Sequence, residues 1–220
     1  MDFKTLAYQY RNELLDNVLP FWLEHSQDLE FGGYFTCLDR KGGVFDTDKF
    51  IWLQGREVWM FSMLYNKVEK RQEWLDCAVQ GGEFLKKYGH NGDYNWYFSL
   101  NRSGRPLVEP YNIFSYTFAT MAFGQLSLAT GSQEYADIAK KTFEIILSKV
   151  DNPKGKWNKL HPDTRNLKNF ALPMILCNLA LEIEHLLDPG YLEQTMVTCI
   201  HHFMDTGRSE EHTSELQSHA

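Results

Sequence analysis

The chain has 220 residues, of which 43% are hydrophobic and 15% aromatic, and its formal net charge is -7. This composition indicates a globular protein with a sizeable core, and the lack of a basic block argues against nucleic acids and anionic membranes as partners. The four cysteines are scattered without metal-ligand spacing, and the charged N-terminus is not a signal peptide. We therefore expect a cytoplasmic protein with reduced thiols and no metal site.

The N-terminal segment predicts a helix followed by a hairpin. Residues 3–24 carry apolar side chains at helical spacing, and Pro20 is expected to kink or end the last turn. Residues 32–46 are rich in aromatic and β-branched side chains around Gly42 and Gly43, which predicts a short β-hairpin.

Helices that are apolar on all sides then alternate with amphipathic helices. The predicted buried helices cover residues 50–67, 110–130 and 169–187. The predicted amphipathic helices cover residues 72–88 and 133–150, and a last helix follows Pro189 and ends near residue 205. The uncharged run 110–133 contains Gln, Asn, Ser, Thr and Gly, which favours a buried core helix over a membrane span. This alternation predicts two concentric helical layers.

A faint internal repeat has an offset of 62 residues. The stretch Tyr34–Gly42 aligns with Trp96–Gly104, and each copy precedes a predicted buried helix. One repeat unit is therefore a hairpin plus a pair of helices. The repeat and the alternation together predict an α/α toroid, of which the visible helices would fill about half.

One cation, Arg56, lies between Trp52 and Trp59 in the run Phe50–Tyr65, which is otherwise almost entirely apolar or aromatic. A guanidinium in a buried helix requires anionic or hydrogen-bonding partners. Two interpretations follow: a structural arginine paired with a distant carboxylate, or an arginine that lines a polar pocket at the mouth of the helix.

Six stretches carry a family resemblance: FWLEHSQDLEFGGYFTCLDRKGGVFD, KFIWLQGREVWMFSMLY, GGEFLKKYG, LNRSGRPL, IFSYTFATMA and FALPMILCNL. They resemble the N-acylglucosamine 2-epimerase (renin-binding protein) family, which includes the cellobiose 2-epimerases, and the resemblance covers essentially residues 5–205. The resemblance implies an all-α (α/α)6 barrel, here an incomplete N-terminal portion with short β-hairpin insertions. It also implies a sugar pocket at the mouth of the ring.

The implied activity is interconversion of N-acetylglucosamine and N-acetylmannosamine by deprotonation and reprotonation at C2 through an enediolate. Arg56 matches the family arginine of WLQGR and would stabilise the enediolate oxygen. The two proton-transfer histidines of the family lie in its C-terminal half and have no match here, so we expect the fragment to be inactive. Candidate substrate contacts, each with core packing as the alternative, are Trp52, Gln54, Tyr111, Phe114, Ser115 and Asn178.

The resemblance implies that the reaction requires no metal and no cofactor. The resemblance allows a nucleotide effector. Such a nucleotide would bind without a Walker motif, because the sequence contains none. The resemblance also allows a homodimer of the full-length protein through the outer helices of the barrel.

The histidines present here have ordinary interpretations. His25 ends the first helix, His90 lies in a turn expected to be solvated, and His161 lies in a polar loop. His201 and His202 are neighbours on a helix and point apart, which is poor geometry for a metal.

The C-terminal stretch 208–220, which includes His212 and His219, has no apolar periodicity and looks like the translation of a sequencing-library adapter. We therefore expect residues 1–207 to be the N-terminal part of an α/α-barrel epimerase domain, and 208–220 to be a non-native tail.

Two other classes of function are weighed against an epimerase. A glycoside hydrolase would need two acids facing across a cleft, and the available acids are Asp28, Glu30, Asp93 and Glu109. A non-catalytic binding protein of the renin-binding type could use the leucines spaced by seven, but three of them more often form one buried helix face. These leucines are Leu172, Leu179 and Leu186.

Overall fold

The computed structural model describes residues 2–110, 112–152 and 170–207. The N-terminal helix comprises α1 (Phe3–Asn12), a π-helical segment (Glu13–Val18) and α2 (Leu19–His25). The following helices are α3 (Ile51–Lys67), α4 (Gln72–Tyr88), α5 (Phe114–Thr130), α6 (Gln133–Ser148), α7 (Ala171–Glu182) and α8 (Tyr191–Gly207), with a 3₁₀ turn (Glu184–Leu186) between the last two. These bounds agree closely with the predicted ranges, apart from a later start of α5.

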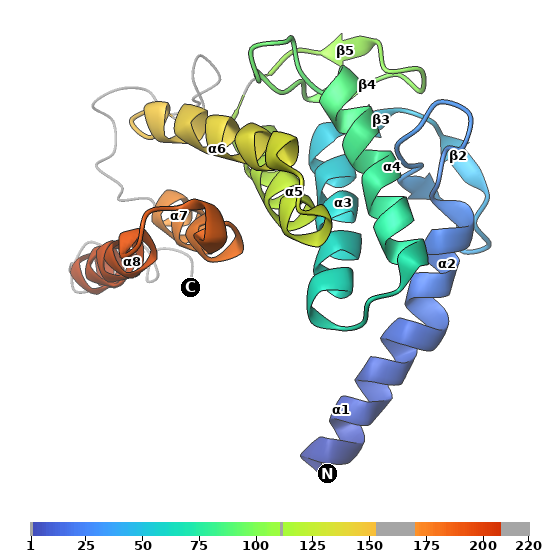
Figure 1. Cartoon of the computed structure of the whole chain (residues 1–220), viewed down its shortest axis with the longest axis horizontal. Coiled ribbons are helices and arrows are strands. Elements are labelled where there is room, and N and C mark those ends of the chain that lie inside the picture. Colours follow the sequence, from blue (N-terminus) through green and yellow to red (C-terminus); the bar gives the residue numbers. More distant parts are fainter. Residues whose placement is uncertain (1, 111, 153–169, 208–220) are drawn as a thin grey trace, which may run out of the picture.

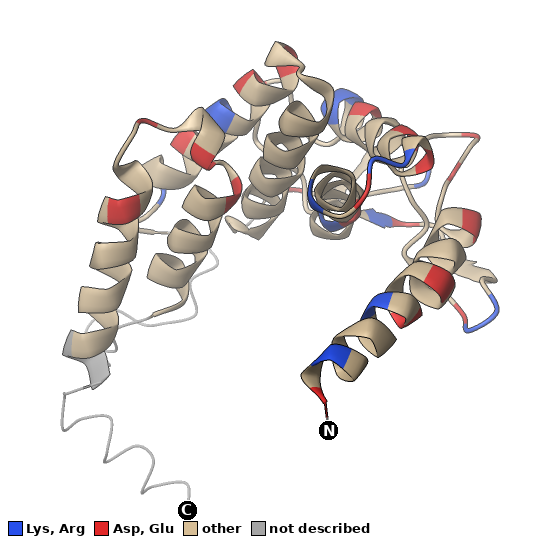
Figure 2. Ribbon diagram, turned by 60° about the horizontal axis from the view of Figure 1, so that its bottom comes forward, with Lys and Arg blue, Asp and Glu red and all other residues tan. Residues whose placement is uncertain are grey.

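The helices form two layers, as the alternation predicts. In the inner layer α3 packs on α5 and α5 packs on α7, while α4, α6 and α8 each pack on the preceding inner helix (Figure 1). The ribbon forms an arch from the N-terminal helix to α8 (Figure 2). The carboxylate of Glu182 in α7 links the inner helices, because it accepts hydrogen bonds from Trp59 of α3 (2.8 Å) and Gln125 of α5 (3.0 Å).

The internal repeat is confirmed in three dimensions. Strands β1 (Cys37–Leu38) and β2 (Val44–Asp46) form one antiparallel hairpin, and β4 (Ser99–Leu100) and β5 (Pro106–Val108) form a second hairpin 62 residues later. A further strand, β3 (Lys49–Phe50), joins β4 and was not predicted.

The two hairpins also share one turn geometry. The Asp39 carboxylate accepts from the backbone N–H four residues later at 2.9 Å, and the Asn101 amide oxygen does the same at 2.8 Å. Gly42 and Gly104 occupy the corresponding left-handed position, with φ of 83° and 89°. This conformation favours glycine in both copies.

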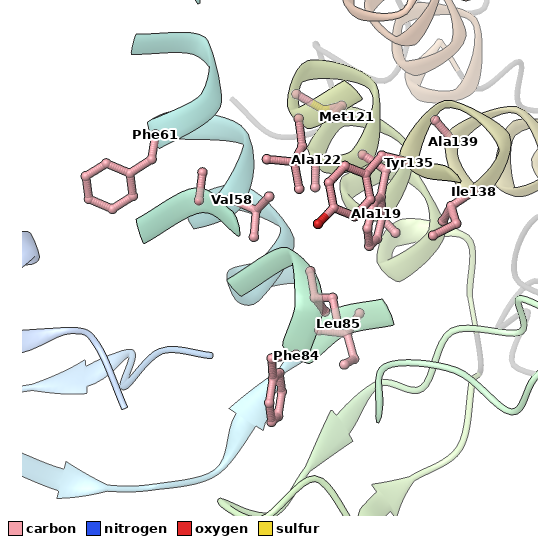
Figure 3. Close-up of a cluster of buried hydrophobic side chains, with 14 of the residues drawn as sticks. Val58, Phe61, Phe84, Leu85, Ala119, Met121, Ala122, Tyr135, Ile138 and Ala139 are labelled. Atoms are coloured by element: carbon pink, nitrogen blue, oxygen red, sulfur yellow. The ribbon is translucent and has the colours of Figure 1, made fainter. Parts of the chain in front are cut away.

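The core lies between the two layers. Side chains from α3, α4, α5 and α6 meet there, and those labelled in Figure 3 are Val58, Phe61, Phe84, Leu85, Ala119, Met121, Ala122, Tyr135, Ile138 and Ala139. Helix α5 is buried on all sides, as its uncharged sequence predicts. Across the described residues, no helix combines the length and hydrophobicity needed to cross a membrane.

The first helix ends at His25, one residue after the predicted range, and Pro20 lies inside α2, directly after the π-helical segment. The π-helical segment accommodates the proline: the Leu19 N–H donates to the carbonyl of Leu14, five residues back, and Pro20 itself has no N–H to place.

One expectation about the helices is wrong, and it concerns α7, which was predicted to be largely buried. Only Leu179 and Ala180 are buried in this helix, while Met174 and Leu181 are about half exposed. Hydrophobicity of a sequence predicts burial only where another element covers the surface, and the described residues cover one side of α7.

Candidate functional site

Arg56 lies on the half-exposed face of α3. Its guanidinium carbon is 5.8 Å from the ring centroid of Trp52 and 5.5 Å from that of Phe118 in α5. The side chain is exposed, so the prediction of a buried cation is wrong. The predicted and the observed exposure of Arg56 differ because the tightly packed side of α3 is the one that carries Gly55. An added Cβ at Gly55 would lie 2.9 Å from the Phe118 carbonyl oxygen of α5.

The structural interpretation of Arg56 requires a carboxylate partner. Among the residues that the structure describes, no carboxylate pairs with Arg56 and no group accepts a hydrogen bond from it. The guanidinium is instead held beside two aromatic rings, and the described part of the chain offers its donors no acceptor, a geometry that suits recognition of oxygen-rich anions or developing negative charge.

A pocket of about 250 Å³ opens beside Arg56. Helix α2 contributes Trp22, the segment before β1 contributes Thr36, and α3 contributes the rest of the lining. The α3 residues are Leu53, Arg56, Glu57, Trp59 and Met60. The pocket therefore combines aromatic walls with a cation, a carboxyl group and a hydroxyl group, the mixture expected of a small-molecule site.

Glu57 is the acidic group of this pocket, and the sequence analysis did not single it out. Its side chain is 6% exposed, and its Oε1 atom has no hydrogen-bond partner among the described residues. Burial raises the pKa of Glu57 to about 8, and the nearby Ser26 hydroxyl offsets only part of this rise. The carboxyl group is therefore neutral at pH 7 and can both donate and accept a hydrogen bond.

A sequence signal for Glu57 does exist. It lies three residues after Gln54 and four before Phe61, so all three share one helix face, and all three are buried. A single acid on a face that also carries a core phenylalanine is a candidate for a raised pKa.

The predicted substrate contacts fall into different environments. Trp52 lies beside Arg56 and is half-buried, with its ring centroid 6.1 Å from that of Phe118. Phe114 is 44% exposed and lies one turn before Phe118 on the same face of α5, whereas Ser115 is buried. The structure thus brings Trp52 and the first turns of α5 close to Arg56.

Gln54 and Asn178 lie elsewhere. The Gln54 side chain is fully buried, and its amide both accepts from the Tyr34 N–H and donates to the Tyr34 carbonyl at 2.8 Å. These bonds fix the segment before β1 against α3, which is a structural role. Asn178 is exposed on α7, with Nδ2 3.9 Å from the sulfur of Met121, and Tyr111 lies outside the described residues.

The histidines give no catalytic pair in the described part of the chain. His25 packs on Phe21, with ring centroids 4.9 Å apart. His90 was expected to be solvated, but it is half-buried against the rings of Tyr94 and Trp96, and burial lowers its pKa. Tyr94 and Trp96, the aromatic residues that follow the turn, pack against the His90 ring.

No group of three His, Cys, Asp or Glu side chains within the described ranges could hold a metal ion, and the helix neighbours His201 and His202 are not part of such a group. His161, His212, His219 and the predicted tail 208–220 lie outside those ranges.

The acids considered for a hydrolase do not face one another across a cleft. Burial alone would raise the pKa of Asp28, but hydrogen bonds from Arg102 and Lys49 outweigh it and lower the pKa to about 2. Glu30 pairs with Arg102 at 2.9 Å, and Asp93 and Glu109 are exposed. Asp28 is therefore the centre of a structural ion cluster that joins the segment after α2 to β3 and to the turn of the second hairpin.

Comparisons with known proteins identify the family and the fold to which this chain is similar. A sequence profile described as N-acylglucosamine 2-epimerase (GlcNAc 2-epimerase) matches residues 33–217, a range that overlaps the predicted tail. The N-acylglucosamine 2-epimerases of Bos taurus and Rattus norvegicus are each 41% identical over 174 residues, or 77% of this chain. The chain spans only 41% and 42% of the length of these two relatives.

Solved structures support the fold. The cellobiose 2-epimerase from Spirochaeta thermophila superposes with a TM-score of 0.73 and 19% sequence identity, over 91% of this chain and 53% of that one. Such a structure is an (α/α)6 barrel, so the two helical layers described above are part of an α/α barrel. At this level of identity, the structural likeness bears on the fold alone.

Proposed function

Because this chain belongs to the N-acylglucosamine 2-epimerase family, we propose that it is the arginine-bearing part of a sugar 2-epimerase. The proposed reaction interconverts N-acetylglucosamine and N-acetylmannosamine. The observation that supports it most is the Arg56 guanidinium, which lines a pocket with aromatic walls and has no acidic partner within the described residues.

The chemistry of C2 epimerisation assigns Arg56 a definite task. In the open-chain sugar, a base removes the proton from C2, next to the C1 carbonyl, and negative charge develops on the C1 oxygen. The intermediate is of the enediolate type, but its C2 carries the acetamido nitrogen in place of a second oxygen. A planar guanidinium can donate one charge-assisted hydrogen bond to the C1 oxygen and a second, parallel one to a neighbouring acceptor of the sugar, and so lower the energy of the intermediate. An acid then returns a proton to the opposite face of C2. Arg56 cannot carry the proton, because its guanidinium stays charged.

We assign the two proton transfers to groups that this chain does not contain. The substrate is a neutral amino sugar, and we propose that the reaction needs neither a metal nor an organic cofactor, since the enediolate is stabilised by the guanidinium. We also propose that the protein acts in the cytoplasm and that outer helices of the barrel form a homodimer. A nucleotide effector would need a site without a Walker motif.

Product analysis tests the proposed function. The full-length protein that contains this chain is incubated with N-acetylglucosamine, and the products are separated and weighed by mass spectrometry. We expect N-acetylmannosamine of unchanged mass, and approach to the same mixture when N-acetylmannosamine is the starting sugar. In a parallel incubation with a disaccharide of N-acetylglucosamine, release of the monosaccharide would support a hydrolase. Unchanged N-acetylglucosamine in the first incubation would contradict the proposal.

A further inference from the structure

The direction of the Arg56 guanidinium is not set by hydrogen bonds within the described part of the chain. The side chain is exposed, and no described group accepts a hydrogen bond from its donors. A free arginine side chain samples many rotamers, whereas a donor that stabilises developing charge acts best when its position is fixed before the reaction. The proposed role of Arg56 therefore requires other groups that orient it.

Two aromatic rings contact the guanidinium, and they come from different helices. The Arg56 guanidinium carbon is 5.8 Å from the ring centroid of Trp52 and 5.5 Å from that of Phe118. Both distances lie within the range of about 6 Å in which a ring face attracts a cation. Trp52 precedes Arg56 by one turn of α3, so it holds the side chain only relative to its own helix. Phe118 belongs to α5 and holds the guanidinium relative to a second helix.

The close contact between α3 and α5 fixes the position of the Phe118 ring. Gly55 directly precedes Arg56, and a Cβ added to it would lie 2.9 Å from the Phe118 carbonyl oxygen and 3.1 Å from the Phe118 Cβ. The absence of a side chain at Gly55 thus lets the two backbones approach where the ring meets the guanidinium. The Phe118 ring also packs on Trp52, with centroids 6.1 Å apart and planes inclined by 49°. The three side chains therefore form one cluster in which Arg56 stays exposed to solvent.

We propose that Phe118 is a positioning residue for the reaction, whose ring holds the Arg56 guanidinium in the direction from which it binds the C1 oxygen of the intermediate. This role rests on the proposed function, because it takes the task of Arg56 to be stabilisation of the enediolate. Phe118 also packs at the edge of the core, so support of the fold alone is the alternative. In that case the effect of changing Phe118 would not depend on the side chain of Arg56.

The first test measures exchange at C2 in heavy water with the full-length protein. A cation–π attraction corresponds to roughly two- to thirtyfold in an equilibrium constant. We therefore expect Phe118→Leu to slow exchange about tenfold, with kcat lowered and KM within about twofold of the original. Phe118→Tyr keeps a ring face, and its rate should stay within about threefold of the original.

A double-mutant cycle shows whether Phe118 acts through Arg56. When Phe118→Leu is added to Arg56→Lys, we expect exchange to slow by less than about twofold further, because lysine lacks the planar fork whose direction the ring sets. The same tenfold loss in both backgrounds is the result expected of a residue that supports the fold alone.

Phe123→Leu is the matched control. Phe123 lies on the same helix, but its ring packs on Trp96 and Tyr135. Exchange in this variant should be unchanged, while urea unfolding measures the stability of every variant separately. If Phe118→Leu does not fold, Phe118→Met, which also removes the ring, takes its place.

The second test requires no turnover. In full-length protein with 15N-labelled arginine, the Nε–H resonance of Arg56 is identified by its loss in Arg56→Lys. Its heteronuclear NOE measures how rigidly the side chain is held on the picosecond to nanosecond timescale. We expect the NOE to fall in Phe118→Leu and to stay high in Phe118→Tyr.

An unchanged NOE in Phe118→Leu, or an equal loss of exchange with and without Arg56→Lys, would overturn the positioning role. These outcomes are separate from the proposed function. Epimerisation by the full-length protein with an unchanged NOE would remove only the role of Phe118. A lower NOE in Phe118→Leu, in a protein that does not epimerise either sugar, would remove only the proposed reaction.

Discussion

At the scale of single residues, Arg56 and Glu57 are adjacent in the sequence but occupy opposite environments. Consecutive residues on a helix point about 100° apart, so one side chain reaches the pocket mouth while the other is buried. The difference in burial also gives the two side chains different chemistry. The exposed guanidinium of Arg56 has no hydrogen-bond acceptor among the described residues, and the buried carboxyl group of Glu57 stays neutral. The sequence motif around WLQGR identifies Arg56, but the exposure of its side chain depends on how α3 packs against α5.

The raised pKa of Glu57 predicts a pH-dependent stability. An unfolded glutamate has a pKa of about 4.3, whereas folded Glu57 has a pKa of about 8. Between these values the folded state holds a proton that the unfolded state releases, so stability decreases as pH rises and levels off above pH 8. Tyr34 and Cys77, which interact with Glu57, stay neutral because burial raises the pKa of each well above its usual value.

Glu57→Gln should remove this dependence. Urea unfolding at pH 5, 7 and 9 measures it, and we expect the variant's advantage to grow from about 1 kcal/mol at pH 5 to about 5 kcal/mol at pH 9. A difference between the two proteins that is the same at all three pH values would show that Glu57 does not titrate as described.

The buried ion cluster gives a second prediction at this scale. Lys49 is fully buried and donates to Asp28 at 2.9 Å, so Lys49→Met leaves a buried carboxylate with one cation fewer. We expect a loss of about 3–5 kcal/mol in the free energy of unfolding, measured with urea. The control is Lys86→Met, which breaks more exposed ion pairs with Glu83 and Glu134 and should cost below about 1 kcal/mol. Equal losses in both variants would contradict a structural role for the cluster.

At the scale of elements, the periodicity of the sequence was sufficient to locate the helices and the first hairpin. The second hairpin followed from the 62-residue repeat, because the same turn residues recur in both copies. Strand β3 and the exposure of α7 could not be predicted in this way. Both depend on which element lies alongside, and such long-range contacts leave no local periodicity.

The contact between α3 and α5 predicts the effect of a single methyl group. In Gly55→Ala the new Cβ would lie 2.9 Å from the Phe118 carbonyl oxygen, and backbone cannot move aside easily. We expect a loss of about 1–3 kcal/mol relative to Gly82→Ala in α4, in which the new Cβ meets only the terminal Cδ2 methyl of Leu126, which can rotate aside. The gain in helix propensity is shared by both variants and cancels in the comparison. Urea midpoints that are equal, or lower for Gly82→Ala, would contradict this packing.

At the scale of the whole molecule, exposed apolar surface lies mainly where the inner and outer layers end. A half-filled toroid implies that α3, α5 and α7 expose apolar surface on the inner side of the ring. Within the described residues no large apolar side chain of α3 is exposed, whereas α5 exposes Phe114 and Leu128 and α7 exposes Met174 and Leu181. The other exposed apolar side chains gather mainly on the two terminal helices. The N-terminal helix exposes Phe3, Tyr8, Tyr10, Leu14 and Val18, and α8, which has few charges (Figure 2), exposes Met196, Val197, Ile200, Phe203 and Met204.

The central claim is that Arg56 stabilises an enediolate in a sugar 2-epimerase, and exchange at C2 tests it most directly. The full-length protein is incubated with N-acetylglucosamine in heavy water, and deuterium at C2 is followed by NMR for the unmodified protein and for Arg56→Lys. Lysine keeps the charge but lacks the planar fork, so we expect exchange at least about a hundredfold slower with the fold intact. The chain described above should give no exchange by itself, because it lacks the proton-transfer groups. Undiminished exchange in the lysine variant, or exchange by this chain alone, would contradict the account.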